Sequence, residues 1–138
     1  MKTTHYFANY CKTIYQSLES IDSKQLDQAA YMAWETHQSS KKIIISGNGG
    51  SAAMASHVAV DFTKAANVRA INFNEADLIT CFSNDYGYEH WLAKALEAYA
   101  DQGDLVILIS SSGKSQNIIN AAEKAKNMGL SVITVSGF

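Results

Sequence analysis

The sequence contains no proline and only two cysteines, and no apolar run reaches the roughly 20 residues that a membrane span needs. The absence of proline excludes Pro-rich linkers and suits a regular, helix-rich scaffold. The two cysteines, Cys11 and Cys81, have neither metal-binding nor redox spacing, so reduced thiols in a cytoplasmic protein are expected. No basic region followed by an apolar core opens the chain, so no signal peptide is predicted.

Excess charge of either sign is also lacking. Lysine and arginine total 11 against 13 for aspartate and glutamate, which leaves a net charge of −2 over 138 residues. Such a balance gives no bulk electrostatic signal for nucleic acid or an anionic membrane, so neither is expected as a partner. The length and an apolar fraction of 47% suit one domain with a real core.

The first 40 residues have a helical pattern. Between residues 4 and 20 the apolar positions recur on one helical face. Asp22 then has the character of an N-cap, with Gln25 at the capping-box position, and a second helix follows to about Gln38. Both helices precede the first strand and cannot be sheet crossovers, so residues 1–40 are predicted to form an arm that packs on the sheet or on another subunit.

From Lys42 onward, strand and helix patterns alternate. The predicted strands lie near residues 43–46, 69–73, 104–109 and 131–135, and the predicted helices near residues 51–64, 76–82, 88–100 and 115–127. The strands are continuous apolar runs, as in a parallel sheet that is covered on both faces. Residues 41–138 are therefore predicted to be an α/β domain with a doubly wound parallel sheet, a Rossmann-like three-layer sandwich.

Two Gly/Ser loops follow predicted strands. Gly47-Asn48-Gly49-Gly50-Ser51 comes directly after Ile43–Ile45, and Ser110-Ser111-Ser112-Gly113-Lys114-Ser115 comes directly after Leu105–Ile109. Each loop opens a helix, where backbone N–H groups, hydroxyls and the helix dipole favour an anion. The alternative for the serines is ordinary N-capping. Together the loops predict a site for a phosphorylated small molecule.

The same loops suggest nucleotide motifs, which we reject. The segment from Gly47 to Ala52 fits G-x-G-x-x-A, but Asp61 is too early and Glu75 too late for the acidic residue of a dinucleotide site. Gly113-Lys114-Ser115 is similar to the end of a Walker A loop, yet its first glycine would fall at Leu108, inside a strand. No nucleotide cofactor is expected.

A third segment, Ser83-Asn84-Asp85-Tyr86-Gly87, completes a set of ordered motifs. Their order and spacing resemble the SIS (sugar isomerase) domain, and within it the phosphoheptose isomerases, from the N-terminal helices through Phe138. The resemblance implies interconversion of sedoheptulose 7-phosphate and an aldoheptose 7-phosphate through an enediol, for lipopolysaccharide or other surface glycans. It also implies a homo-oligomer, a tetramer or a dimer, with sites at subunit interfaces, and zinc as a possible cofactor.

Roles carry over from the family by position. In the first loop, the resemblance implies that the sugar phosphate is contacted by Asn48, Gly49 and Gly50, with Ser51 at the helix start. It implies that sugar hydroxyls are bound by Asn84 and Asp85. It implies that the phosphate is held by Ser110, Ser111, Ser112 and Ser115. His57 and Asp61 match a histidine and a glutamate that bind zinc, the glutamate being also credited with proton abstraction.

His57 and Asp61 are four residues apart and so share a helical face. Such a pair can ligate a metal, or the carboxylate can act as a base next to a carbonyl. An ordinary hydrogen bond along the helix is the alternative.

The chain departs from the family pattern in two ways. Asp61 replaces the glutamate, and a shortening of that order can cost about 10²-fold in rate. The sequence also stops at Gly137-Phe138, where family members continue with a strand and a helix that carry a glutamine and an acid/base histidine. His90 could approach the site, although a solvated or capping histidine is the alternative.

The strand at residues 131–135 is then expected to form an exposed apolar edge, covered by a partner chain or belonging to a longer protein. A competing function follows from these departures. The chain could be a non-catalytic SIS module that binds a sugar phosphate or a protein partner, of the type that associates with the replication initiator.

Overall fold

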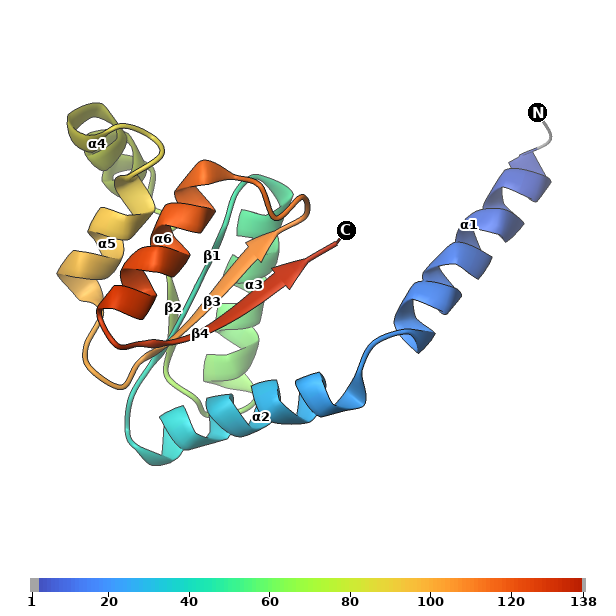
Figure 1. The fold of residues 1–138 in the computed structure, drawn as a ribbon, viewed down its shortest axis with the longest axis horizontal. Coiled ribbons are helices and arrows are strands. Elements are labelled where there is room, and N and C mark those ends of the chain that lie inside the picture. The colour runs from blue at the N-terminus through green and yellow to red at the C-terminus, as the bar shows by residue number, and fades with distance from the viewer. Residues whose placement is uncertain (1–2, 138) are drawn as a thin grey trace. The chain divides into compact units, whose positions relative to one another are not determined.

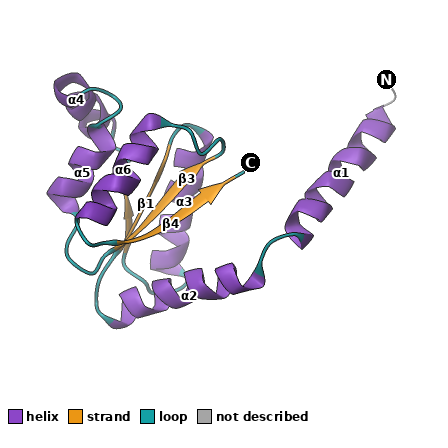
Figure 2. Cartoon of the chain, viewed as in Figure 1, coloured by secondary structure: helices purple, strands orange, loops and turns teal. Residues whose placement is uncertain are grey.

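The computed structural model describes residues 3–137 and confirms the predicted α/β class (Figures 1 and 2). The strands are β1 (Ile43–Gly47), β2 (Ala70–Asn72), β3 (Leu105–Ser110) and β4 (Ser131–Ser136). The helices are α1 (Thr3–Glu19), α2 (Ser23–Gln38), α3 (Gly50–Lys64), α4 (Ala76–Tyr86), α5 (Trp91–Tyr99) and α6 (Gln116–Asn127). Within the described residues no helix is long and apolar enough to span a bilayer.

The sheet is parallel throughout and has the order β2-β1-β3-β4. The chain moves outward from β1 to β2, then returns past β1 to add β3 and β4. Because parallel crossovers are right-handed, this reversal puts α3 on one face and α5 and α6 on the other (Figure 1). The switch in direction lies between β1 and β3, where doubly wound sheets bind ligands beyond the carboxyl ends of the strands.

Alternate strand residues supply the two halves of the core. Ile44 and Val106 point to the face covered by α5 and α6, where they pack with Trp91. Ile43 and Ile45 point to the opposite face, toward α3. The β1 isoleucines are fully buried, which explains why the strand has a continuous apolar run instead of an alternating one.

Helix α4 is longer than predicted, and α5 begins later. The predicted helix at residues 76–82 continues to Tyr86, where the rings of Phe82 and Tyr86 meet edge to face at 5.7 Å. It ends at Gly87, which has a φ of 85°. The predicted helix at residues 88–100 starts only at Trp91, since residues 88–90 form a turn. The Ser83-Asn84-Asp85 motif therefore lies on a helix.

The N-terminal helices are present, and the predicted N-cap is confirmed: Lys24 N donates to Asp22 Oδ1 at 2.9 Å. The chain divides into compact units between Tyr31 and Met32, because Met32 packs with the core on the α3 side of the sheet. In the preceding unit the predicted apolar positions of α1 remain exposed in the single chain, namely Tyr6, Phe7, Tyr10, Ile14 and Leu18.

Strand β4 is at the edge of the sheet, as predicted. It pairs with β3 on one side, and no other described strand pairs with its outer side. Val135 is 47% exposed there. The predicted apolar edge is thus present in the described part of the chain.

A buried ion pair joins the amino ends of β1 and β3. Lys42 Nζ lies 2.6 Å from Asp104 Oδ2 and 2.6 Å from Asp101 Oδ2, and Lys42 N donates to Asp104 Oδ1 at 3.0 Å. Asp104 is fully buried. Burial lowers the pKa of Lys42, but hydrogen bonds and charge attraction from Asp101 and Asp104 outweigh it, so this pKa lies above its ordinary value.

Acid is expected to weaken this ion pair. The hydrogen bond from Lys42 holds the pKa of Asp101 below its ordinary value of 3.8. The contribution of Asp101 to stability is therefore complete above that value and is lost as the pH falls through the folded pKa. Urea unfolding of the wild type and Asp101→Asn should differ most near neutral pH, with a gap that closes in acid. A gap that is independent of pH would contradict this assignment.

Candidate functional site

The Gly/Ser loops meet at the switch point of the sheet. Strands β1 and β3 are hydrogen-bonded neighbours, and Gly47 pairs in register with Ile109. Asn48 follows one of these residues and Ser110 the other, so both loops leave the sheet at the same height. The structure therefore brings together the loops that the sequence predicted to share a ligand.

The first loop approaches β3 so closely that only glycine fits. A Cβ added at Gly47 would lie 2.6 Å from Ser51 Cβ and 2.8 Å from Ile109 O. Gly49 has a φ of 52° and occupies the N-cap of α3, which has no side-chain cap. Ser51 N and Ala52 N donate to Asn48 O at 2.9 and 3.3 Å, which leaves the Gly50 amide of this turn for water or an anion.

Gly47→Ala is expected to destabilise the chain by about 1–3 kcal/mol, because the new methyl group would displace backbone atoms. Gly50→Ala is the matched control, since nothing lies within 4 Å of a Cβ there and its φ is not positive. Chemical unfolding of both variants measures the difference. Equal stabilities would contradict the close packing between the first loop and β3.

The second loop has donors that are not used for capping. Ser115 occupies the N-cap of α6, but its side chain makes no capping hydrogen bond. Its hydroxyl instead lies 3.4 Å from Ser110 Oγ. Ser112 Oγ accepts from Lys114 N at 3.2 Å, and Gly113, with a φ of 64°, turns the loop. The capping alternative therefore does not account for Ser115, whose hydroxyl remains beside the uncapped end of α6.

A group of amide and phenol side chains joins the loops, and the sequence did not reveal it. Asn48 and Asn117 exchange two hydrogen bonds of 2.8 Å each, and Tyr88 Oη donates to Asn48 Oδ1 at 3.1 Å. Asn117 lies in the first turn of α6 and is 2% exposed. The available signal was an asparagine at a position where the helical pattern requires a buried residue.

The predicted sugar-binding residues Asn84 and Asp85 lie in the last turn of α4. Both are exposed, and Asn84 Nδ2 donates to Asp85 Oδ1 at 2.9 Å. Within the described residues, their hydrogen bonds stay on α4. The turn that follows reaches the first loop through Tyr88, so α4 is connected to the Gly/Ser loops indirectly.

His57 and Asp61 pair along α3, with His57 Nε2 and Asp61 Oδ2 3.5 Å apart. Their side chains are 80% and 61% exposed. Asp61 follows Ser51 by ten residues, so about 15 Å of helix separates it from the first loop. Within one chain the structure does not bring this pair to the Gly/Ser loops.

The same pair provides only part of a zinc site. Structural and catalytic zinc ions take three or four protein ligands. Within residues 3–137 no group of three or more histidine, cysteine, aspartate or glutamate side chains is placed to hold a metal. His57 and Asp61 could provide two ligands.

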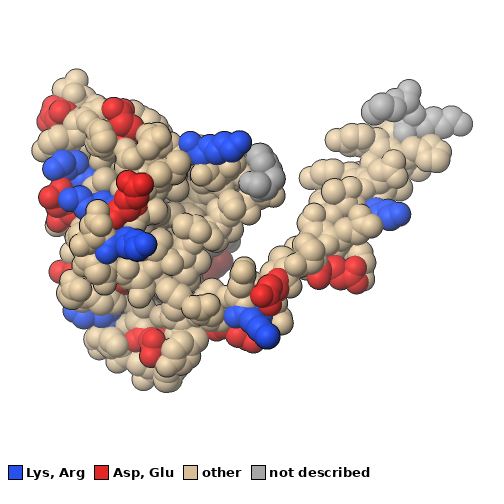
Figure 3. Space-filling model, in the orientation of Figure 1, with Lys and Arg blue, Asp and Glu red and all other residues tan. Residues whose placement is uncertain are grey.

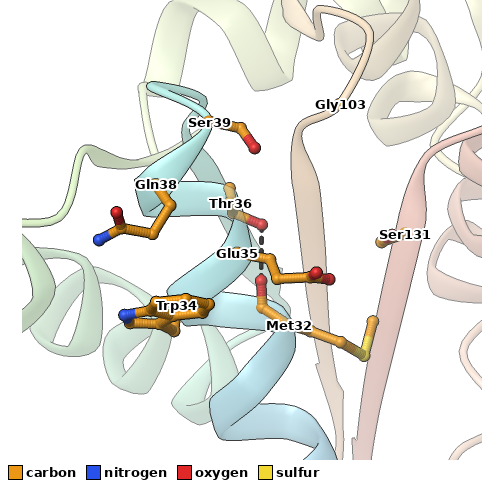
Figure 4. Close-up of a pocket in the computed structure, with 8 residues that line it drawn as sticks. All are labelled: Met32, Trp34, Glu35, Thr36, Gln38, Ser39, Gly103 and Ser131. Carbon is orange, nitrogen blue, oxygen red and sulfur yellow. Dashed lines mark hydrogen bonds between the residues drawn. The ribbon is translucent and has the colours of Figure 1, made fainter.

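A cavity of about 330 Å³ lies at the opposite end of the sheet (Figure 4). It is lined by the end of α2 and by Gly103 and Ser131, which precede or begin β3 and β4. In Figure 4, Met32 and Glu35 point toward the strand that carries Ser131. Because it lies at the amino ends of the strands, this cavity is separate from the Gly/Ser loops at their carboxyl ends.

Basic and acidic side chains intermingle on the face of the α/β unit shown in Figure 3. The only charged residue within either Gly/Ser loop is Lys114. Recognition of an anion at these loops would therefore rest mainly on N–H groups and hydroxyls.

Comparisons with known proteins agree with this geometry. A model of the SIS domain matches residues 5–137. The phosphoheptose isomerase of Helicobacter pylori (strain P12) is 36% identical over 137 residues, covering 95% of this chain and 71% of its own length. That of Fusobacterium nucleatum is 37% identical over 124 residues, covering 86% of this chain and 64% of its own length.

Two solved structures of phosphoheptose isomerases are also similar to this chain. The phosphoheptose isomerase of Neisseria gonorrhoeae has a TM-score of 0.87 and 29% identity, covering 98% of this chain and 74% of that one. A phosphoheptose isomerase from Francisella tularensis, at 24% identity and a TM-score of 0.89, shares the fold.

Proposed function

Because the chain belongs to the SIS domain family and groups there with the phosphoheptose isomerases, we propose that it interconverts sedoheptulose 7-phosphate and an aldoheptose 7-phosphate. The observation that carries the proposal is the pair of uncapped helix ends, α3 and α6, that begin at neighbouring loops of the switch point. The similarity to isomerases favours this reading over the non-catalytic binding module.

The phosphate would bind at the second loop. Ser110, Ser111, Ser112 and Ser115 are the proposed hydroxyl donors, together with the first amides of α6. The first loop, Asn48-Gly49-Gly50 with Ser51, would contact the sugar phosphate from the other side. These groups are neutral, so they suit a phosphate that must be bound and released at each turnover.

The chemistry requires a base at the other end of the sugar. A carboxylate removes a proton from C1 of the ketose, next to the C2 carbonyl, to give the enediol as its enediolate anion, with the negative charge on O2. Return of a proton to C2, with transfer of the hydroxyl proton from O1 to O2, gives the aldose. Asp61 is the proposed base, with His57 beside it on α3.

Since α3 directs Asp61 away from its own Gly/Ser loops, we propose that a second copy of the chain supplies this carboxylate. The product would enter heptose supply for surface glycans. Asn84 and Asp85 are the proposed contacts to sugar hydroxyls. His57 and Asp61 are the proposed ligands of a zinc ion.

The test is an assay of sedoheptulose 7-phosphate with the protein expressed from its complete coding sequence. Aldose formation can be followed by the NMR signal of the C1 proton, with and without added zinc. Incorporation of solvent deuterium at C2 is expected if the enediol forms. Absence of aldose under both conditions would overturn the proposed function.

A further inference from the structure

Asn117 is a buried amide with an unusual set of partners. It is 2% exposed, whereas most asparagines lie at the surface. A buried amide without partners is costly, and Asn117 meets this requirement through the side chain of Asn48. The partner is a half-buried residue of the first loop, and it is proposed above to contact the sugar phosphate.

The hydrogen bonds fix which way the Asn48 amide faces. Asn48 Oδ1 accepts from Asn117 Nδ2 at 2.8 Å and from Tyr88 Oη at 3.1 Å, which uses both lone pairs. Asn48 Nδ2 gives one of its hydrogens to Asn117 Oδ1 at 2.8 Å. If the Asn48 amide were flipped while Asn117 stayed in place, oxygen would face oxygen and nitrogen would face nitrogen, and both hydrogen bonds would be lost. One side-chain N–H of Asn48 is therefore left to donate to a ligand, whereas Asn48 Oδ1 has no lone pair left to accept from one.

The pair also joins the first loop to the start of α6. Asn48 directly follows β1, whereas Asn117 lies in the first turn of α6, beyond the serine loop that leaves β3. Tyr88 adds the turn between α4 and α5 and is 53% exposed. Three segments that are distant in sequence thus meet at one amide group.

We propose that Asn117 is a positioning residue: it holds the Asn48 amide so that its remaining N–H donates to a bound sugar phosphate. This inference rests on the proposed function in so far as Asn48 contacts that ligand. Asn117 itself makes no contact with the ligand. Tyr88 assists by occupying the Asn48 oxygen, so that only acceptor atoms of the ligand are recognised.

A double-mutant cycle tests the assignment. Asn117→Leu keeps the branched shape and the burial but removes the amide. We expect Asn117→Leu to raise the Kd of sedoheptulose 7-phosphate, measured by calorimetry, by about tenfold. In an Asn48→Ala background the same change should alter the Kd by less than about twofold, since its effect passes through Asn48. A tenfold loss in both backgrounds would overturn the proposal.

Two further variants keep the test decisive. Asn117→Ala replaces Asn117→Leu in the cycle if the leucine does not fold. Asn120→Ala is the matched control, one turn further along α6, where Asn120 Nδ2 donates to Glu89 O at 2.8 Å and does not contact Asn48. Unchanged affinity is expected for Asn120→Ala. An equal loss at both positions would assign the effect to packing of α6 and would overturn the role of the amide.

A measurement without ligand separates this inference from the proposed function. In the free protein the Asn48 side-chain amide should show two distinct NMR signals, one of them slow to exchange with solvent. Asn117→Leu should make both exchange quickly, and Tyr88→Phe should change them less. If the wild type binds no sedoheptulose 7-phosphate, the proposed function fails. If the Asn48 signals do not respond to Asn117→Leu, the positioning role fails.

Discussion

Asp61→Asn is expected to lower kcat for sedoheptulose 7-phosphate by about 10²- to 10⁴-fold, the range in which general bases contribute. The amide keeps the size of the side chain and cannot accept the C1 proton. KM should change little, because the proposed phosphate contacts are the serine hydroxyls and amides of the second loop and do not include Asp61. Steady-state kinetics on the purified variant measure both constants.

Two other variants make that result specific. Asp61→Glu restores the longer arm of the family pattern and is expected to raise kcat, by up to about 10²-fold, if the shorter arm misplaces the carboxylate. Asp77→Asn removes an exposed carboxylate from the first turn of α4 and should leave kcat unchanged. Full activity of Asp61→Asn would exclude Asp61 as the base.

The location of Asp61 adds a test of assembly. If one copy supplies the loops and another the carboxylate, Asp61→Asn and Asn48→Ala impair different parts of each site. Mixed and reassembled, the two impaired variants should show more activity than the sum of the two alone, because some sites then contain an intact half from each copy. Failure to regain activity in verified mixed oligomers would place the whole site within one chain.

Lys42→Met should cost about 3–5 kcal/mol of stability, the usual effect of removing one partner from a buried ion pair. Asp104 is fully buried and would lose the cation that lies 2.6 Å from its Oδ2. A single domain has only about 5–15 kcal/mol in total, so the midpoint of urea unfolding should fall steeply. The loss should be visible as an unchanged slope with a lower midpoint.

Asp101→Asn provides the comparison. Its side chain is 71% exposed, and Lys42 would keep Asp104 as a partner, so a much smaller loss is expected. The ion pair joins the amino ends of the strands, so the variants that remain folded should bind sugar phosphate with normal affinity. Equal losses in Lys42→Met and Asp101→Asn would contradict the importance of the buried contact.

The sheet could be predicted because its signals are local. Ile43–Ile45 and Leu105–Ile109 are apolar runs that directly precede Gly/Ser loops, and the parallel sheet followed from them. The end of α4 was predicted too early, since the edge contact of Phe82 with Tyr86 extends the helix to Gly87. Phe82 and Tyr86 are four positions apart, the spacing of neighbours on one helical face, so the longer helix could have been predicted from the sequence.

The candidate site was predictable only in part. The loops lie together because β1 and β3 are neighbours, which the order of motifs implied. Asn117 could not be chosen as a partner of Asn48, because the pairing depends on how α6 is placed against a loop 69 positions earlier. The helical spacing of His57 and Asp61 was correct, but spacing does not tell which way a helix face points relative to the ligand loops.

The register of Gly47 with Ile109 has a thermodynamic consequence. Neighbouring strands are about 4.8 Å apart, so the backbone ladder holds the bases of both loops at a fixed separation before any ligand arrives. Their conformational entropy is lost when the domain folds, and little more should be lost when phosphate binds. Binding should accordingly show a small change in heat capacity and nearly the same loop positions in the free and bound states.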